Sequence, residues 1–510
     1  MKFPSLILFS IVFLGGAVAY MKFDSNESNS LRVAFPTANS SLSYEPTDIH
    51  LDFEYVFLEN IYSPLVEFDA GGVIRPGVAE KVIFDGDQVR MEIRRNLKTQ
   101  SGSPITADDV AFSLKRLLVL SGNTHGNFRD LICPGVDLKS VEDQCPGLKV
   151  EGNTVILAAG ERKAFVLPML AAIDFAIIPK KSVDPTTLKI IDMKEASGPY
   201  FVAADDSKGH IELRQNPYHY HSTKGTPAEI RFVPMTTGEK GESLKALLDD
   251  KVDHLMTVDT SRSDETLEFA KNHPEFLVHT THKIRTINLT FTETGIRRLT
   301  DEQRRLIGAK VREVFHSIYG NVPGMESRDE FIPGLGDGSL DSAQHAELAK
   351  INSDVAQTLP DKVRIGLLKR SGLEAWSIPL GKALPNAVFS KQTDVPDLMK
   401  EVNPNDEPDA FIAATDTGFM EDISLISYSL NAGYLGLKKA DRPKWLADYM
   451  ATEQKSDRMN MLRRLHFDAL AKPVIVPLEA SPYTALVRKP WTMELSELYA
   501  NNQLWRIKHQ

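Results

Sequence analysis

A short stretch that ends at Ile93 alternates hydrophobic and polar positions. Val89, Met91 and Ile93 are apolar, and charged residues stand between them. Alternation with a period of two is typical of a half-buried strand in an antiparallel sheet. The dipeptide Asp85-Gly86 shortly before this stretch is a turn signal for a β-hairpin. The pattern therefore predicts a hairpin whose second strand ends near Ile93.

A helical pattern follows the hairpin. Apolar residues recur at helical spacing from Val110 to Leu118. Thr106 stands three residues before Asp109, which is the spacing of a capping box. Asp108 and Asp109 also place negative charge at the positive end of the helix dipole. The sequence thus predicts a well-capped helix, and none of these residues points to catalysis.

The same two patterns recur along the rest of the chain, with no repeat of fixed length. We expect strands at 31–35, 154–158, 176–178, 211–218, 228–234, 284–290, 363–368, 409–414, 474–478 and 484–487. We expect helices at 53–62, 165–172, 244–248, 260–272, 300–318 and 457–470. Strands and helices alternate without a strict β–α–β rhythm. This favours an α/β fold with mixed sheets in at least two lobes.

Length and charge narrow the class of protein. The chain has 510 residues, of which 42% are hydrophobic and 25% are charged. That length exceeds what one hydrophobic core usually supports, so two or more lobes are expected. The net charge of −10 argues against binding of nucleic acid, which needs a basic face.

The N-terminus has the pattern of a targeting segment. Lys2 is followed by an apolar run that ends in the small-x-small sequence Ala-Val-Ala at 17–19. We therefore expect a signal peptide at 1–19, cleaved after residue 19, and a flexible spacer at 20–30. An uncleaved N-terminal anchor is the alternative. Either form predicts an exported protein, and a periplasmic location is expected.

The two cysteines, Cys133 and Cys145, each begin a Cys-Pro-Gly triplet. In an exported protein this favours one disulfide that closes a short loop. Half of a metal site is the alternative, although no third or fourth ligand stands at ligand spacing.

Motifs of enzyme chemistry are missing from the sequence. The glycine-rich segment at 334–338 is not followed by the lysine of a phosphate-binding loop. The histidine pairs, His219 with His221 and His279 with His282, fit surface or partly buried positions better than a metal site. Neither Gly-x-Ser-x-Gly nor His-Glu-x-x-His is present. The sequence favours a protein that is not an enzyme and that holds neither metal nor cofactor.

Four blocks of the sequence carry a family resemblance. In chain order they are Asn60–Leu118; Ser197–Tyr200 with Leu213–Tyr218; Leu247–Leu255; and Val474–Leu478 with Leu486–Trp491 and a closing strand at Leu504–Ile507. In this order and spacing they resemble the extracytoplasmic solute-binding proteins of family 5. That family includes the oligopeptide- and dipeptide-binding proteins of ABC transporters. Lys251 stands where the family usually has a glycine.

The resemblance implies a two-lobed fold similar to the type II periplasmic binding proteins, with mixed sheets and an extra inserted subdomain. Lobe I would be assembled from 31–61, 190–283 and 478–510. The inserted subdomain would span 62–189 and contain the cysteine loop, and lobe II would span 284–477. Two chain crossings would join the lobes.

The function that the resemblance implies is capture of peptides in the cleft between the lobes and their delivery to a membrane permease of an ABC importer. The protein would act as a monomer. One alternative is a binding protein for another solute, such as a nickel chelate or an oligosaccharide. A ligand-sensing scaffold with the same fold and an exported hydrolase are further alternatives.

The resemblance also implies which segments contact the ligand. Asp416 could hold the N-terminal ammonium of a peptide, although relatives usually have that aspartate where Gly418 stands and an aromatic residue where Thr415 stands. Glu421 and Asp422 are alternatives, and a site that binds no free N-terminus is another. The expected ligand-binding residues are Thr47, Asp48, Ile49, His50, Arg370, Glu374, Trp376, Ala414, Thr415, Asp416, Thr417, Gly418 and Phe419.

Overall fold

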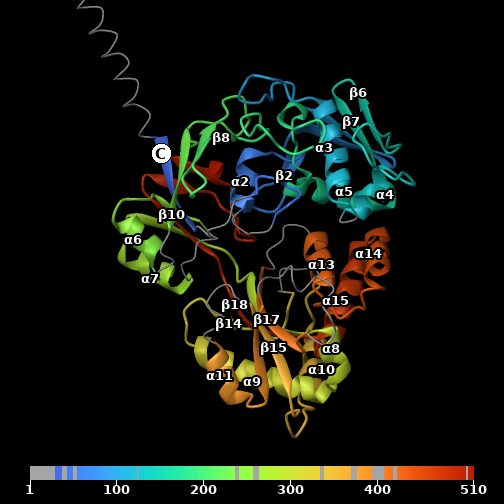
Figure 1. Cartoon of the computed structure of the whole chain (residues 1–510), viewed down its shortest axis with the longest axis vertical. Coiled ribbons are helices and arrows are strands. Elements are labelled where there is room, and N and C mark those ends of the chain that lie inside the picture. Colours follow the sequence, from blue (N-terminus) through green and yellow to red (C-terminus); the bar gives the residue numbers. More distant parts are fainter. Residues whose placement is uncertain are drawn as a thin grey trace, which may run out of the picture.

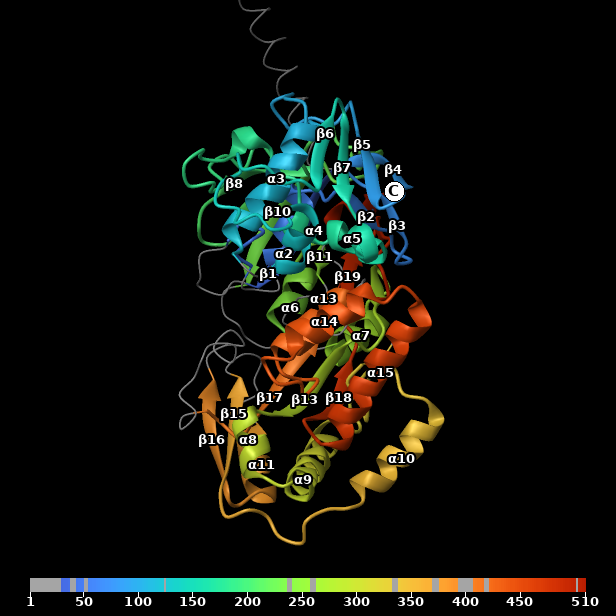
Figure 2. The same ribbon diagram turned by 90° about the vertical axis from the view of Figure 1, so that its right-hand side faces the viewer.

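Two bodies, one above the other, make up the computed structural model of the protein (Figures 1 and 2). The upper body contains a seven-stranded and a four-stranded sheet, and the lower body contains a six-stranded sheet. We call the parts built on these three sheets lobe I, the inserted subdomain and lobe II. The structure describes residues 29–36, 43–49, 54–122, 125–235, 241–256, 263–332, 338–368, 376–392, 407–416, 422–500 and 503–510.

Lobe I is organised around a mixed sheet of order β12-β19-β11-β1-β10-β9-β8. Its strands come from distant parts of the chain, because β1 pairs in parallel with both β10 and β11. Helices α2 (Glu54–Ile61), α6 (Glu242–Leu248) and α7 (Ser263–Asn272) accompany it. The strands are β1 (Ser30–Pro36), β8 (Tyr200–Asp205), β9 (Ile211–Gln215), β10 (Glu229–Met235), β11 (His254–Leu255), β12 (Phe276–Thr280) and β19 (Thr484–Arg488). A short ribbon of β20 (Trp491–Met493) and β21 (Ile507–His509) contacts this sheet, whereas the ribbon of β2 (Val66–Phe68) and β3 (Ile74–Pro76) contacts α5 (Lys163–Ala171) and β4 (Ala79–Asp85) of the inserted subdomain.

The inserted subdomain contains the predicted hairpin and capped helix. Its antiparallel sheet has the order β4-β5-β7-β6, and Asp85 pairs with Gln88 at the hairpin turn. The Thr106–Asp109 capping box is confirmed, since each side chain accepts the backbone N–H of the other residue. A disulfide joins Cys133 to Cys145 and confirms the pairing. The elements are β4 (Ala79–Asp85), β5 (Gln88–Ile93), α3 (Ala107–Leu120), α4 (Gly126–Ile132), β6 (Leu148–Glu151), β7 (Thr154–Ala158), η2 (Gly160–Arg162), α5 (Lys163–Ala171), η3 (Ile173–Phe175) and η4 (Lys180–Ser182).

Lobe II is built on a mixed sheet of order β14-β18-β13-β17-β15-β16. Helix α9 lies on one face, where Gly308 packs closely against Val476. On the other face Tyr434 packs beside Phe411, so both faces are covered. The strands are β13 (Arg285–Phe291), β14 (Glu326–Ser327), β15 (Val363–Leu368), β16 (Ala387–Gln392), β17 (Ala410–Asp416) and β18 (Ile475–Ser481). The helices are α8 (Glu293–Arg298), α9 (Asp301–Tyr319), α10 (Ser342–Asn352), α11 (Ser377–Ala383), α13 (Asp422–Asn431), α14 (Arg442–Ala451) and α15 (Lys455–Ala471).

The chain passes between the lobes in two short crossings that lie side by side. One connects β12 to β13 at 281–284, and the other connects β18 to β19 at 482–483. The Thr281 N–H donates to the Tyr483 carbonyl at 2.9 Å, and the Tyr483 N–H donates to Thr281 Oγ1 at 2.9 Å. Strand β18 of the lobe II sheet ends at Ser481, directly before the second crossing.

The mixed α/β class is confirmed, and two local predictions are wrong. Residues 176–178 form no strand, because the Ile177 and Ile178 N–H groups donate to Ser63 and Ser113 instead of to a neighbouring strand. Leu504–Arg506 form a 3-10 turn, and the closing strand β21 starts at Ile507. In both places hydrogen bonds to residues distant in the sequence replace the strand that the apolar pattern predicted.

None of the helices in the described ranges has the length and apolar character needed to cross a membrane. The expected signal peptide at 1–19 lies outside the described residues.

A buried histidine makes the stability of lobe II depend on pH. The imidazole of His466 on α15 donates from Nδ1 to the Gly338 carbonyl at 2.9 Å. Its Nε2 accepts the N–H groups of Phe331 and Ile332 at 3.2 and 3.3 Å. Burial lowers the pKa of His466 to about 4, because a charged imidazole would lose its hydration.

Acidification should destabilise the protein through His466. Between pH 6.5 and about pH 4 the imidazole is protonated in the unfolded chain but neutral in the folded chain, because its pKa is 6.5 in the first state and about 4 in the second. The free energy of unfolding should therefore fall by about 1.4 kcal/mol per pH unit from this residue alone. Urea titrations at several pH values give the slope of the unfolding free energy against pH. In His466→Asn this slope should be smaller by about the contribution of one proton. The exposed His210→Asn is the control, and an equal loss of slope in both variants would contradict the assignment.

Candidate ligand-binding region between the lobes

The loop after β1 leaves lobe I at the edge from which the chain crosses to lobe II. Strand β12 is antiparallel to β19, which is antiparallel to β11, and β11 is parallel to β1. Strands β1 and β12 therefore end at the same edge of the sheet. The first crossing starts there at Thr281. The loop that contains Thr47, Asp48 and Ile49 accordingly follows a strand that points towards lobe II.

Strand β17 ends at the corresponding edge of lobe II. In the register of the sheet Asp416 pairs with Arg285, which in turn pairs with Ser481. Arg285 is the first residue of β13 after one crossing, and Ser481 is the last residue of β18 before the other. The Arg285 guanidinium lies 5.7 Å from the ring centroid of Tyr483 in the second crossing. Asp416 thus lies beside the first crossing, and strand β13 separates it from the second.

Strand β1, which precedes the first predicted segment, and strand β17, which contains the second, therefore end at the facing edges of the two lobe sheets. Ala414 and Asp416 are half-buried and share one face of β17, since side chains alternate along a strand. Asp48 is exposed, whereas Ile49 is half-buried and packs against the core of lobe I. This arrangement could not be read from the sequence, because it depends on the register of strands hundreds of residues apart.

Two other predicted residues have partners within lobe II. The hydroxyl of Thr415 donates to the Tyr434 hydroxyl at 3.1 Å on the opposite face of β17. The Trp376 indole N–H donates to the Tyr319 hydroxyl at 2.8 Å, and its ring packs edge-on against Phe315 of α9. A ligand role for either residue stays a prediction that this packing does not support.

Of the remaining predicted residues, Asp422 is the first residue of helix α13. The others lie outside the described ranges, namely His50, Arg370, Glu374, Thr417, Gly418, Phe419 and Glu421.

Glu45 anchors the loop of lobe I, which the sequence did not reveal. The Arg116 guanidinium of α3 is only 2% exposed, and both of its terminal nitrogens donate to the Glu45 carboxylate, one of them at 3.0 Å. Arg116 Nε donates to the Leu188 carbonyl at 2.8 Å. Glu45 Oε1 also accepts the Thr47 hydroxyl at 3.0 Å. The loop is thereby bound to the inserted subdomain by a bidentate ion pair.

The buried histidine His219 has a structural environment. Its Nδ1 accepts the His221 backbone N–H at 3.1 Å, and burial lowers the pKa of His219 well below its usual value. The neutral ring therefore carries its proton on Nε2, which lies 2.9 Å from the Ser63 hydroxyl. An imidazole that donates to a serine cannot accept that serine's proton, so this pair is not an activated nucleophile. Within the described ranges no three metal-binding side chains come together.

The sequence matches one family model over residues 73–313, that of the bacterial extracellular solute-binding proteins, family 5 Middle. A comparison with curated protein sequences finds no match.

Solved structures with the same fold share little sequence with this chain. The murein tripeptide binding protein MppA of Escherichia coli has 15% identity and a TM-score of 0.72, over 94% of this chain and 98% of that one. Haemophilus influenzae OppA in complex with the peptide RPPGFSPFR has 13% identity and a TM-score of 0.70, over 94% and 99%. Staphylococcus aureus NikA in complex with Ni(L-His)2 has 13% identity and a TM-score of 0.67, over 94% and 100%. At such identity the likeness shows a shared fold.

Proposed function

Because residues 73–313 match the model of the bacterial extracellular solute-binding proteins of family 5, we propose that the chain is a member of that family, captures peptides between its two lobes and delivers them to the membrane permease of an ABC importer. The observation that carries this proposal is that strands β1 and β17, which lead to or contain the predicted ligand segments, end at the facing edges of the two sheets. The similar fold of MppA and OppA, a tripeptide binding protein and a peptide complex, supports the choice of solute. The protein would be exported by its N-terminal signal peptide, act outside the cytoplasm as a monomer, and catalyse no reaction.

The end of β17 offers backbone groups to an extended peptide. Among the described residues, β15 pairs with β17 only as far as Ile412, whereas β13 pairs with it up to Asp416. In our proposal a peptide adds as a strand beside Ala413–Asp416, so that its main chain supplies affinity without regard to side-chain identity. Closure of the lobes about the two crossings would then bury it.

Asp416 would bind the N-terminal ammonium of the peptide. A charge-assisted hydrogen bond contributes about 1.5–3 kcal/mol, so Asp416→Asn should weaken binding of a free tripeptide roughly 10- to 100-fold. Binding of the N-acetylated tripeptide should change little. Isothermal titration calorimetry measures both, and the exposed Asp457→Asn on α15 is the matched control. Equal effects of Asp416→Asn on both peptides would exclude this role.

The proposed function is tested by identifying the solute that the protein carries. Purified protein is denatured, and the released small molecules are analysed by mass spectrometry and for metals. Short peptides of mixed sequence are the expected result. Release of a nickel chelate or an oligosaccharide would identify that molecule as the solute instead of peptides. Turnover of a peptide would favour a hydrolase. An empty protein that shows no thermal shift with a peptide library would overturn the proposal.

A further inference from the structure

A second contact joins the two bodies at a distance from the crossings. Helix α5 and turn η2 of the inserted subdomain pack against α13 and α14 of lobe II. Figure 1 shows this junction on the right of the molecule, while β18, which leads into the second crossing, lies to its left. The two bodies are therefore connected on one side by the chain and on the other side only by packing.

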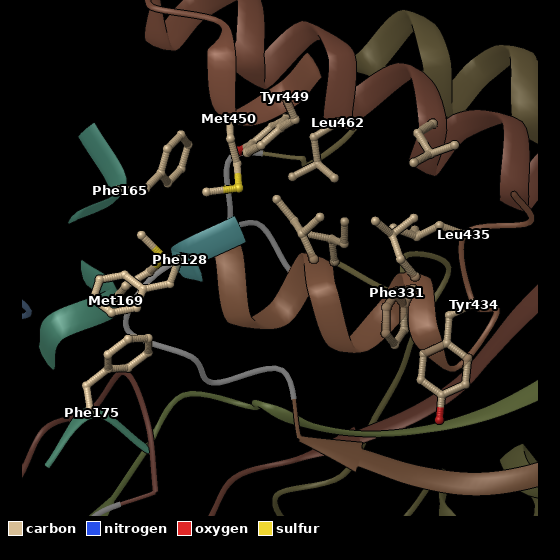
Figure 3. Close-up of a cluster of buried hydrophobic side chains, with 14 of the residues drawn as sticks. Phe128, Phe165, Met169, Phe175, Phe331, Tyr434, Leu435, Tyr449, Met450 and Leu462 are labelled. Atoms are coloured by element: carbon tan, nitrogen blue, oxygen red, sulfur yellow. The ribbon is translucent and has the colours of Figure 1, made fainter. Parts of the chain in front are cut away.

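The packing is aromatic and aliphatic. The ring of Phe165 lies 5.8 Å from the ring of Tyr449, measured between centroids. Met450 lies next to Tyr449 and also faces Phe165, while Met169 lies deeper in the subdomain (Figure 3). All four side chains are buried and belong to one continuous hydrophobic cluster that extends into both bodies.

A cation covers the edge of this packing. The Arg458 guanidinium of α15 lies 5.0 Å from the centroid of the Phe165 ring. Its Nη1 donates to the carbonyls of Thr452 and Glu453, each at 2.8 Å. The guanidinium is thus held in place by lobe II and contacts a ring of the subdomain, which is a favourable cation–π arrangement.

Opening the lobes must separate these surfaces. Two bodies joined by short crossings move apart by rotation about those crossings, and the far side moves most. Rotation would expose Phe165, Tyr449 and Met450 to water, and apolar surface resists that exposure. We propose that this junction, with Phe165 against Tyr449 and Met450, is an apolar latch that keeps the two lobes closed before any solute binds.

The latch sets how readily the binding region opens. Full burial of one phenylalanine side chain in the closed form alone favours closed over open molecules roughly 10- to 100-fold. A solute enters only the open form, so its association is expected to be slow and to become faster when the latch is weakened. This consequence depends on the proposed function, whereas the latch itself does not.

The test compares two phenylalanines of the same cluster in solute-free protein. Phe165 and Phe175 are 6% and 5% exposed, but Phe175 contacts Phe128 and His125 within the subdomain. The protein is unfolded in guanidinium without reductant, dialysed and refolded, and native mass spectrometry verifies that it is empty. Small-angle X-ray scattering then gives the radius of gyration of wild type, Phe165→Ala and Phe175→Ala.

Wild type should scatter as the closed structure does. Phe165→Ala should shift the ratio of open to closed molecules roughly 10- to 100-fold and raise the radius of gyration, whereas Phe175→Ala should lower only the thermal midpoint. Phe165→Leu serves in its place if the alanine variant does not refold. Empty wild type that is already as expanded as Phe165→Ala, or a Phe165→Ala that stays as compact as wild type, would overturn the latch. Because no solute is present, either outcome leaves the peptide-binding proposal intact.

Discussion

Replacing Glu45 by alanine is expected to lower the free energy of unfolding by about 3–5 kcal/mol. The Arg116 guanidinium is almost fully buried, and Glu45 is the carboxylate that neutralises it. Removal of that carboxylate leaves a cation in a low-dielectric site, where the Leu188 carbonyl still accepts from Arg116 Nε. The Thr47 hydroxyl loses its acceptor as well, so the loop that we place in the binding region should also loosen.

Chemical denaturation of single and double variants measures this coupling. Glu45→Ala with Arg116→Met removes both charges, so it should be markedly more stable than Glu45→Ala alone. Glu92→Ala is the control, because Glu92 and Lys81 form an ion pair at 3.9 Å in which both side chains are more than half exposed. Such a pair contributes less than about 1 kcal/mol. A double variant whose loss equals the sum of the two single losses would show that Glu45 and Arg116 act independently.

The sequence predicts those helices, caps and strands that depend only on residues close together in the chain. The Thr106–Asp109 and Thr300–Gln303 capping boxes need only their own spacing, and both are formed. The hairpin at Asp85 and strand Val363–Leu368 follow from local alternation in the same way. These elements give the class of fold, because their patterns are decided within a few residues.

The proposed binding region depends on pairings between distant residues, which no local sequence pattern contains. Glu45 and Arg116 are 71 residues apart, and only the folded subdomain brings them together. The position of Asp416 requires its register with Arg285 and the register of Arg285 with Ser481. Trp376 shows the opposite case, in which an expected pocket residue packs against α9. A family resemblance locates such segments approximately, and the strand register decides which side chains are accessible.

The blocks that carry the family resemblance act as structural junctions. Gly198 and its neighbour Ser197 contact the end of α2, where the Gly198 N–H donates to the Ile61 carbonyl at 2.9 Å. The Ser63 N–H donates to the Ser197 hydroxyl at 3.0 Å. Asn216, from the second half of the same block, donates to the Gly198 carbonyl at 3.3 Å. The motif thus joins lobe I to the start of the inserted subdomain, and these hydrogen bonds constrain its residues.

Gly198→Ala should therefore cost about 3 kcal/mol of unfolding free energy, at the upper end of the cost of overpacking. An added Cβ would lie 2.5 Å from the Ile61 carbonyl carbon and 2.7 Å from the Tyr62 nitrogen, and both are backbone atoms that cannot rotate away. Relief requires α2 to move, which breaks the hydrogen bond to Ile61. Gly126→Ala on α4 is the matched control, since its added Cβ meets nothing within 4 Å and should leave stability unchanged or raise it by about 0.5 kcal/mol. Thermal and urea unfolding compare the two variants, and equal stabilities would mean that close packing at Gly198 does not explain the glycine of this motif.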